Sequence, residues 1–196
     1  LHTDLIKEMV FRDLHRLYPE RIVNKTNGIT FRRWLFEANP GLTRILVDTI
    51  GPRVLDDAEA LTGIEKLAGD SEFQSRMQAA KLANKEALAK IIADQLMIKV
   101  DPRALFDVQI KRIHEYKRQL LNILETIALY NEIRAQPTRD FVPRVKIFAG
   151  KAAASYHQAK LIIKLANDVA RVVNGDPTVR GLLKVAFLPN YNVSLA

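Results

Sequence analysis

The alternation of strand and helix patterns after Pro102 limits the fold of this chain more than any other feature. Apolar and polar residues alternate over 106–110 with the period of a half-buried strand. The whole pattern reads strand, helix, strand, helix, strand, with strands at 106–110, 145–149 and within 182–188 and helices at 115–134 and 155–173. Strands separated by single helices form a parallel sheet with crossover connections. The sequence therefore predicts an α/β fold built on a βαβαβ unit, about half of a Rossmann-like sheet.

The residues before this unit have the periodicity of helices. Helical spacing of apolar residues predicts one helix over 1–17 and a long helix over 71–96, with Ser71 as a plausible N-cap. Shorter helices are expected around 34–36, 42–50 and 58–67. Both ends of the chain fall inside predicted helices, so we expect it to be a segment of a longer polypeptide.

Composition and charge restrict the possible classes of protein. The chain has 196 residues, 48% of them apolar, and 30 Lys and Arg against 22 Asp and Glu, a net charge of +8. It has no cysteine, which excludes disulfides, thiolate metal sites and a cysteine nucleophile. No apolar stretch approaches the roughly 20 residues that span a bilayer. A cytoplasmic chain with an anionic partner (nucleic acid, phosphate or a membrane surface) is expected.

The most unusual segment is 111–118, which directly follows the first predicted strand. It contains four cations and a histidine at the expected start of a helix, where the helix dipole already places partial positive charge. Ligands of open parallel sheets bind at the carboxyl ends of strands. This arrangement is explained if an anion occupies the position, held by backbone N–H groups and basic side chains. A solvated basic helix end is the alternative.

Other candidate residues leave two interpretations each. Gly150, followed by Lys151, could bring backbone close to a ligand or could simply end a strand. Trp34 could be a stacking platform or a core anchor, and Tyr191 a ligand contact or a cover over the sheet edge. The four histidines lack the spacing of metal ligands, so no metal site is expected.

Four motifs of the chain resemble signature segments of the α-glucan phosphorylases, which include the glycogen, maltodextrin and starch phosphorylases. They occur in the order of the family and cover essentially the whole chain: residues 24–30 with 32–35, 106–122, 150–153 and 190–196. The resemblance implies the glycosyltransferase-B arrangement of two Rossmann-like domains across a cleft. The chain would then divide into the end of an N-terminal domain and the junction (1–28), a helical linking region (29–105) and an incomplete C-terminal domain (106–196).

The resemblance also implies an enzymatic activity. Such enzymes transfer a terminal α-1,4-linked glucosyl unit to inorganic phosphate, giving glucose 1-phosphate with retained configuration. Their cofactor, pyridoxal phosphate, serves through its own phosphate group. The lysine that attaches this cofactor is expected beyond Ala196, so we expect the chain alone to be inactive. An α-1,4-glucan and phosphate are the expected partners of a homodimeric cytoplasmic enzyme, without nucleic acid or membrane.

Roles for individual residues follow from the same resemblance. Arg112 and Lys117 would hold the substrate phosphate as catalytic residues. Lys111 would help hold the cofactor phosphate, and Trp34 and Tyr191 would line the cofactor.

Substrate contacts are implied at two further positions. Asn27 and Tyr116 would form hydrogen bonds with the glucosyl unit. Asn192 stands where some members of the family have an arginine, so a contact with the cofactor phosphate is not expected there.

Two alternatives to an enzyme remain: a basic nucleic-acid-binding module, and a non-catalytic scaffold that resembles a phosphorylase.

Overall fold

The computed structural model describes residues 1–25, 28–179 and 181–195. Its centre is a parallel sheet of three strands in the order β1 (Leu105–Ile110), β2 (Arg144–Ala149) and β3 (Leu183–Leu188). Helix α5 (Gln119–Ala135) connects β1 with β2, and α6 (His157–Gly175) connects β2 with β3. This is the βαβαβ unit that the sequence predicts, so the predicted fold class is confirmed.

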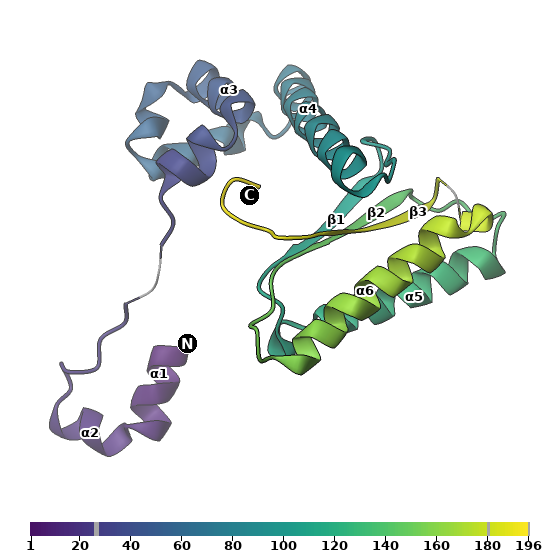
Figure 1. Cartoon of the computed structure of the whole chain (residues 1–196). Coiled ribbons are helices and arrows are strands. Elements are labelled where there is room, and N and C mark those ends of the chain that lie inside the picture. Colours follow the sequence, from purple (N-terminus) through teal and green to yellow (C-terminus); the bar gives the residue numbers. More distant parts are fainter. Residues whose placement is uncertain (26–27, 180, 196) are drawn as a thin grey trace.

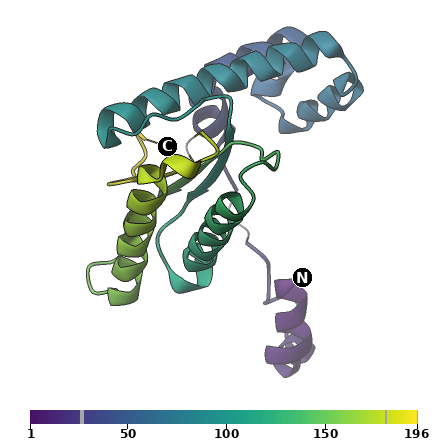
Figure 2. The same ribbon diagram turned by 90° about the vertical axis from the view of Figure 1, so that its right-hand side faces the viewer.

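The sheet is the middle of three layers. Helices α5 and α6 cover one face, and α4 (Ser71–Leu96) crosses the other face (Figures 1 and 2). On the α5 and α6 side, Phe148 and Phe187 pack among buried aliphatic residues of the two helices. On the α4 side, Ile92 packs against the alternate residues of the same strands. The strands β2 and β3 are therefore almost completely buried, as parallel strands covered on both faces should be.

Strand register determines where the site can form. Ile110 pairs with Ala149, and Ala149 pairs with Leu188, so the three strands end at the same level. The segments that follow the three strands consequently begin side by side at one edge of the sheet.

Helix α5 begins later than the sequence predicts. Residues Glu115–Lys117 form a 3-10 turn, and Arg118 adopts a left-handed backbone with φ 60°, so regular helix begins at Gln119 instead of residue 115. The prediction that the basic segment forms the first turn of this helix is therefore wrong. Its cations belong to a loop that is anchored by the buried side chain of Ile113.

The long helix α4 has the predicted bounds but a different cap. The carboxylate of Asp70 accepts a hydrogen bond of 2.7 Å from the backbone N–H of Phe73, so Asp70 is the N-cap and Ser71 is the first helical residue. Either side chain can cap a helix, and the carboxylate also interacts favourably with the helix dipole.

The region before α4 is helical but irregular. It contains a π-helical turn (Arg32–Glu37), α3 (Pro40–Ile50) and two 3-10 helices (Pro52–Leu55 and Ala58–Leu67). The side chain of Asn39 caps α3 by accepting a hydrogen bond from the N–H of the third residue of that helix. Three of these segments correspond to the short helices that the sequence predicts, whereas the 3-10 helix Pro52–Leu55 was not predicted.

The first predicted helix is divided in the structure. Short helices α1 (His2–Leu5) and α2 (Arg12–Leu17) flank a π-helical stretch (Ile6–Val10). These residues stand apart from the sheet in both views (Figures 1 and 2). The apolar side chains that form the predicted stripe are exposed: Leu5, Ile6, Val10, Leu14 and Leu17.

A polar cluster fastens the end of α6 to α5, and it leads to a pH-dependent prediction. The Tyr130 hydroxyl donates a hydrogen bond of 2.6 Å to Asp176, and Arg134 lies 3.4 Å from the same carboxylate. The hydrogen bond from Tyr130, helped by those from Thr178, lowers the pKa of Asp176 to about 2. Because this pKa is below that of an unfolded aspartate, the stabilisation is present above about pH 4 and is lost as the pH falls towards 2.

We therefore expect Asp176→Asn to lower the Tm at pH 7 and to have progressively less effect between pH 4 and pH 2. Thermal unfolding followed by circular dichroism at several pH values measures this difference. Asp56→Asn is the control, because Asp56 is exposed and belongs to none of the ion pairs within the described residues. An equal loss of Tm at pH 7 and pH 2 would contradict the assignment.

Candidate active site

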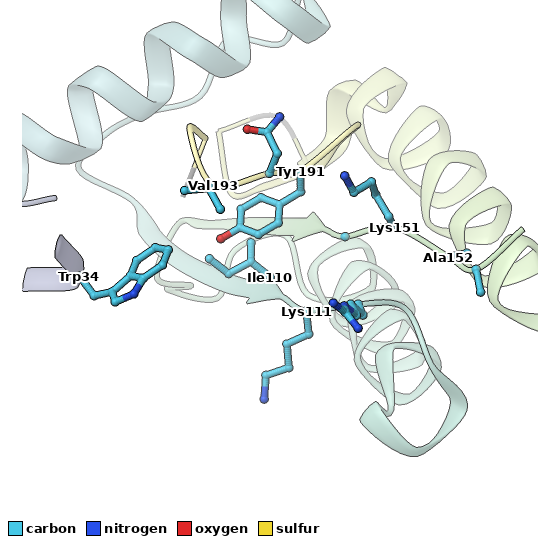
Figure 3. A pocket seen from close by; sticks show the side chains of 11 residues that line it. Trp34, Ile110, Lys111, Lys151, Ala152, Tyr191 and Val193 are labelled. Atoms are coloured by element: carbon cyan, nitrogen blue, oxygen red, sulfur yellow. The ribbon is translucent and has the colours of Figure 1, made fainter. Parts of the chain in front are cut away.

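An open cavity of about 630 Å³ lies at the carboxyl ends of the strands (Figure 3). This is the edge at which open parallel sheets bind their ligands. The cavity combines the last residue of β1, the segments after all three strands, and the π-helical turn. Its lining consists of Trp34, Ile110, Lys111, Arg112, Gly150, Lys151, Ala152, Ala153, Tyr191, Asn192 and Val193.

The charge of the cavity lining is entirely positive. Lys111, Arg112 and Lys151 line it, and no Asp or Glu does. None of the ion pairs among residues 1–25, 28–179 and 181–195 includes these three cations. Uncompensated cations around a concave surface attract and bind anions, and guanidinium groups suit phosphate or carboxylate oxygens. The cavity is therefore built to receive a negatively charged group.

Contact between two loops places these cations. The backbone N–H of Lys111 donates to the carbonyl of Ala149, and that of Ile113 donates to the carbonyl of Lys151, each at 3.1 Å. A Cβ atom at Gly150 would lie 2.0 Å from the carbonyl oxygen of Lys111. The group that comes close to Gly150 is therefore the neighbouring loop, and Gly150 also directly follows the end of β2.

Two aromatic rings border the cavity. Trp34 comes from the π-helical turn and is 46% exposed, and the guanidinium of Arg33 lies 5.6 Å from the centre of its ring. Tyr191 follows β3 and packs partly against the core on the α4 side. In Figure 3 the Lys111 side chain extends away from the Tyr191 ring.

Two of the predicted site residues lie outside the cavity lining. Tyr116 is 70% exposed, and the Nζ atom of Lys117 lies 5.7 Å from the centre of its ring. The structure thus brings four of the predicted residues together around one cavity and places these two beside it. Asn27 lies outside the described residues.

The far end of the basic loop is attached to the start of α6. The Tyr156 hydroxyl donates a hydrogen bond of 2.5 Å to the Glu115 carboxylate and accepts one of 3.2 Å from the Glu115 backbone N–H. Its ring also packs edge-on against His114, with 5.0 Å between ring centres. The hydrogen bond to Glu115 raises the pKa of Tyr156. These contacts hold the loop in a single position relative to α6.

Two residues that build the site were not among the predicted site residues. Lys151 supplies one of the three cations. Gln119 is 1% exposed, and its side chain donates to the carbonyl of Arg112 at 3.2 Å and accepts from the N–H of His114 at 3.4 Å. An amide directly after the basic segment, at the start of α5, was the available signal for Gln119. The side chain of Asn192 donates a hydrogen bond to the carbonyl of Asn190 and accepts one from the backbone N–H of Ser194.

Two other kinds of site are missing from the part of the chain that the structure describes. No group of three or more His, Asp or Glu side chains there could hold a metal ion. No helix in the described ranges has the length and apolar character needed to cross a membrane.

The fold and the cavity together define an α/β protein with a basic cavity at the carboxyl edge of a parallel sheet. Comparison with known families makes the assignment specific. The model of the carbohydrate phosphorylase family matches residues 1–196. The chain therefore belongs to the carbohydrate phosphorylase family.

Individual relatives agree with this assignment. The chain is similar to the liver form of glycogen phosphorylase from Homo sapiens, with 48% identity over 196 residues. It is 49% identical over 195 residues to a glycogen phosphorylase of Chlamydia pneumoniae, and 48% identical over 196 residues to that of Haemophilus influenzae. All of this chain is covered in each comparison, but only 23%, 24% and 24% of the relatives. The chain thus spans about a quarter of the length of these proteins.

Proposed function

We propose that this chain supplies the phosphate-handling part of an α-glucan phosphorylase, which transfers terminal α-1,4-linked glucosyl units to inorganic phosphate. The observation that carries the proposal is the group of three unpaired cations around the cavity: Lys111, Arg112 and Lys151. Similarity to glycogen phosphorylases along the whole chain supports the choice of reaction.

The reaction gives a physical reason for such a concentration of charge. Two phosphate groups must approach one another when a cofactor phosphate assists a substrate phosphate. Two unit negative charges 4 Å apart repel by about 4 kcal/mol at an effective dielectric constant of about 20. Fixed cations offset this repulsion and stabilise the charge that develops in the transition state. We assign Arg112, with Lys117, to the substrate phosphate.

The lining of the cavity suits pyridoxal phosphate. Trp34 and Tyr191 would contact its flat ring, and Lys111 would help to hold its phosphate group. When bound, the cofactor supplies a phosphate group that exchanges a proton with the substrate phosphate. The protein's own contribution is to orient the two phosphates and to keep their negative charges balanced.

The rest of the proposal concerns the partners. Tyr116 and Asn27 are assigned to the glucosyl unit, because they match the positions implied by the resemblance to phosphorylases. The Tyr116 ring lies 4.3 Å from the His114 ring, centre to centre, and is 70% exposed, so a sugar could pack on its exposed surface. The protein would act as a homodimer in the cytoplasm on an α-1,4-glucan.

The test is phosphorolysis by a full-length phosphorylase that carries this segment. Incubated with glycogen, inorganic phosphate and pyridoxal phosphate, it should release glucose 1-phosphate at a rate that saturates with phosphate. The 196-residue chain, assayed in parallel, should release none, because an activity that needs both faces of a cleft requires the remaining three-quarters of the protein. Release of free glucose independent of phosphate would show hydrolysis instead and would refute the proposal.

A further inference from the structure

Three side chains connect the backbone of Lys117 with the interior of the sheet. The Nε2 atom of Gln109 on β1 donates a hydrogen bond of 3.0 Å to the carbonyl oxygen of Lys117. The Oε1 atom of Gln109 accepts from Nδ2 of Asn122 on α5 at 2.9 Å. The Oδ1 atom of Asn122 in turn accepts from Nζ of Lys146 on β2 at 3.0 Å.

Lys146 is a buried charge with several partners. Its side chain is only 3% exposed, and its Nζ atom lies 2.5 Å from the Asp107 carboxylate and in contact with that of Glu125. Arg144 lies 3.3 Å from Glu125. A buried ammonium is tolerated only when it is paired in this way, so its position is strongly determined.

The ammonium also determines the direction of every hydrogen bond in this chain of side chains. Lys146 can only donate, so Asn122 must present its oxygen to Lys146 and its NH2 group to Gln109. Gln109 must then present its oxygen to Asn122 and its NH2 group to the Lys117 carbonyl. Neither amide can rotate by 180° without placing two donors or two acceptors face to face.

We propose that Gln109 and Asn122 are positioning residues for Lys117, with Lys146 as the fixed end of the relay. The relay holds the loop at Lys117, on the opposite side from the contacts of Gln119 and Tyr156 with residues 112–115. The role for Lys117 rests on the proposed function, whereas the geometry of the relay does not.

Asn122→Asp distinguishes positioning from simple structural support. The new carboxylate still accepts the hydrogen bond from Lys146, but it is the third carboxylate beside Asp107 and Glu125, so some loss of Tm is expected. The carboxylate cannot donate to Gln109, however. If Gln109 turns its NH2 group towards the new carboxylate, its own oxygen faces the Lys117 carbonyl oxygen. If Gln109 keeps its orientation, its oxygen faces an oxygen of the new carboxylate. The link to Lys117 is broken in both cases.

The first experiment is hydrogen–deuterium exchange on the 196-residue chain. The amides of Lys117 and Arg118 donate to the carbonyls of residues 114 and 115 within the loop. Loss of one supporting hydrogen bond should make them exchange about 3–10 times faster in Asn122→Asp. The amide of Ile147 in the buried strand β2 is the internal reference and should not change. Equal acceleration at Ile147, or no acceleration at Lys117, would overturn the proposal.

Two further variants sharpen this measurement. Gln109→Glu keeps the acceptor towards Asn122 and removes the donor towards Lys117, so it should accelerate exchange at the same two amides. Asn131→Asp adds the same charge at an exposed position of α5, and the amides of Lys117 and Arg118 should exchange in it at the wild-type rate.

The second experiment is kinetic and uses a full-length phosphorylase that carries this segment. Asn122→Asp and Gln109→Glu should reduce kcat/KM for phosphate about 5–20 times at a temperature well below the Tm of each variant, and Asn131→Asp should not. A wild type without phosphorolysis would refute the proposed function and leave the exchange result to decide on the relay. An active wild type whose two variants have unchanged kinetics would overturn the positioning role.

Discussion

Arg112→Ala in a full-length phosphorylase that carries this segment is expected to lower kcat for phosphorolysis by a factor of about 10²–10³. Removal of one preorganised group that stabilises charge in a transition state has an effect of this size. Arg112 lines the cavity and takes part in no ion pair among the described residues, so its charge is available to a ligand. Initial rates of glucose 1-phosphate release at saturating glycogen measure the effect.

Arg171→Ala is the matched control for this variant. Arg171 is an exposed arginine on α6 that pairs with Asp168 at 3.0 Å, far along the helix from the cavity. Its loss removes the same charge, and the rate should stay within a factor of two of the wild type. Similar rates for Arg112→Ala and Arg171→Ala would show that Arg112 does not act on the phosphate.

Gly150→Ala is expected to destabilise the chain by about 2–3 kcal/mol, as overpacking of a tight contact does. The new methyl group would lie 2.0 Å from the Lys111 carbonyl oxygen and 3.1 Å from Cδ1 of Ile113. Both neighbours are parts of the loop that continues β1, and the first is backbone that cannot rotate away. The ends of β1 and β2 must therefore separate. For a chain of this size, the Tm should fall by about 4–12 °C.

The same separation should also affect the site. Lys111 and Lys151 flank the contact, so anion binding should weaken together with stability in Gly150→Ala. Gly175→Ala is the control, since nothing lies within 4 Å of a Cβ atom at that position near the end of α6. Its Tm should remain equal to or exceed that of the wild type. A wild-type Tm for Gly150→Ala would contradict the observed loop contact.

The βαβαβ core could be predicted because its signals are local. The alternation over 106–110 and the apolar runs of β2 and β3 have the strand period, and the intervening helices have helical periodicity. The predicted bounds of α4 also agree with the structure, since a single capped helix of that length depends little on its surroundings. The partners of the polar residues of β1 could not be predicted. Asp107 and Gln109 face polar partners of β2 and α5, and only the structure reveals those partners.

The start of α5 could not be predicted for a related reason. Residues 115–118 have ordinary helical spacing, but the hydrogen bonds of Tyr156 with Glu115 and of Gln109 with Lys117 hold a 3-10 turn there. Each of these bonds joins residues that are eight or more positions apart in the sequence. Tertiary contacts of this kind override local propensity.

The order of the elements, the parallel sheet and the concentration of charge after β1 could all be predicted, since each depends on neighbouring residues along the chain. Which cations share a cavity depends on long-range packing and became known from the fold. Trp34, Lys111, Lys151 and Tyr191 come from four separate segments, and the common register of the strand ends places three of those segments at one edge. Long-range packing also places Lys117 beside this cavity, because the loop that carries it is held by side chains of β1 and α6.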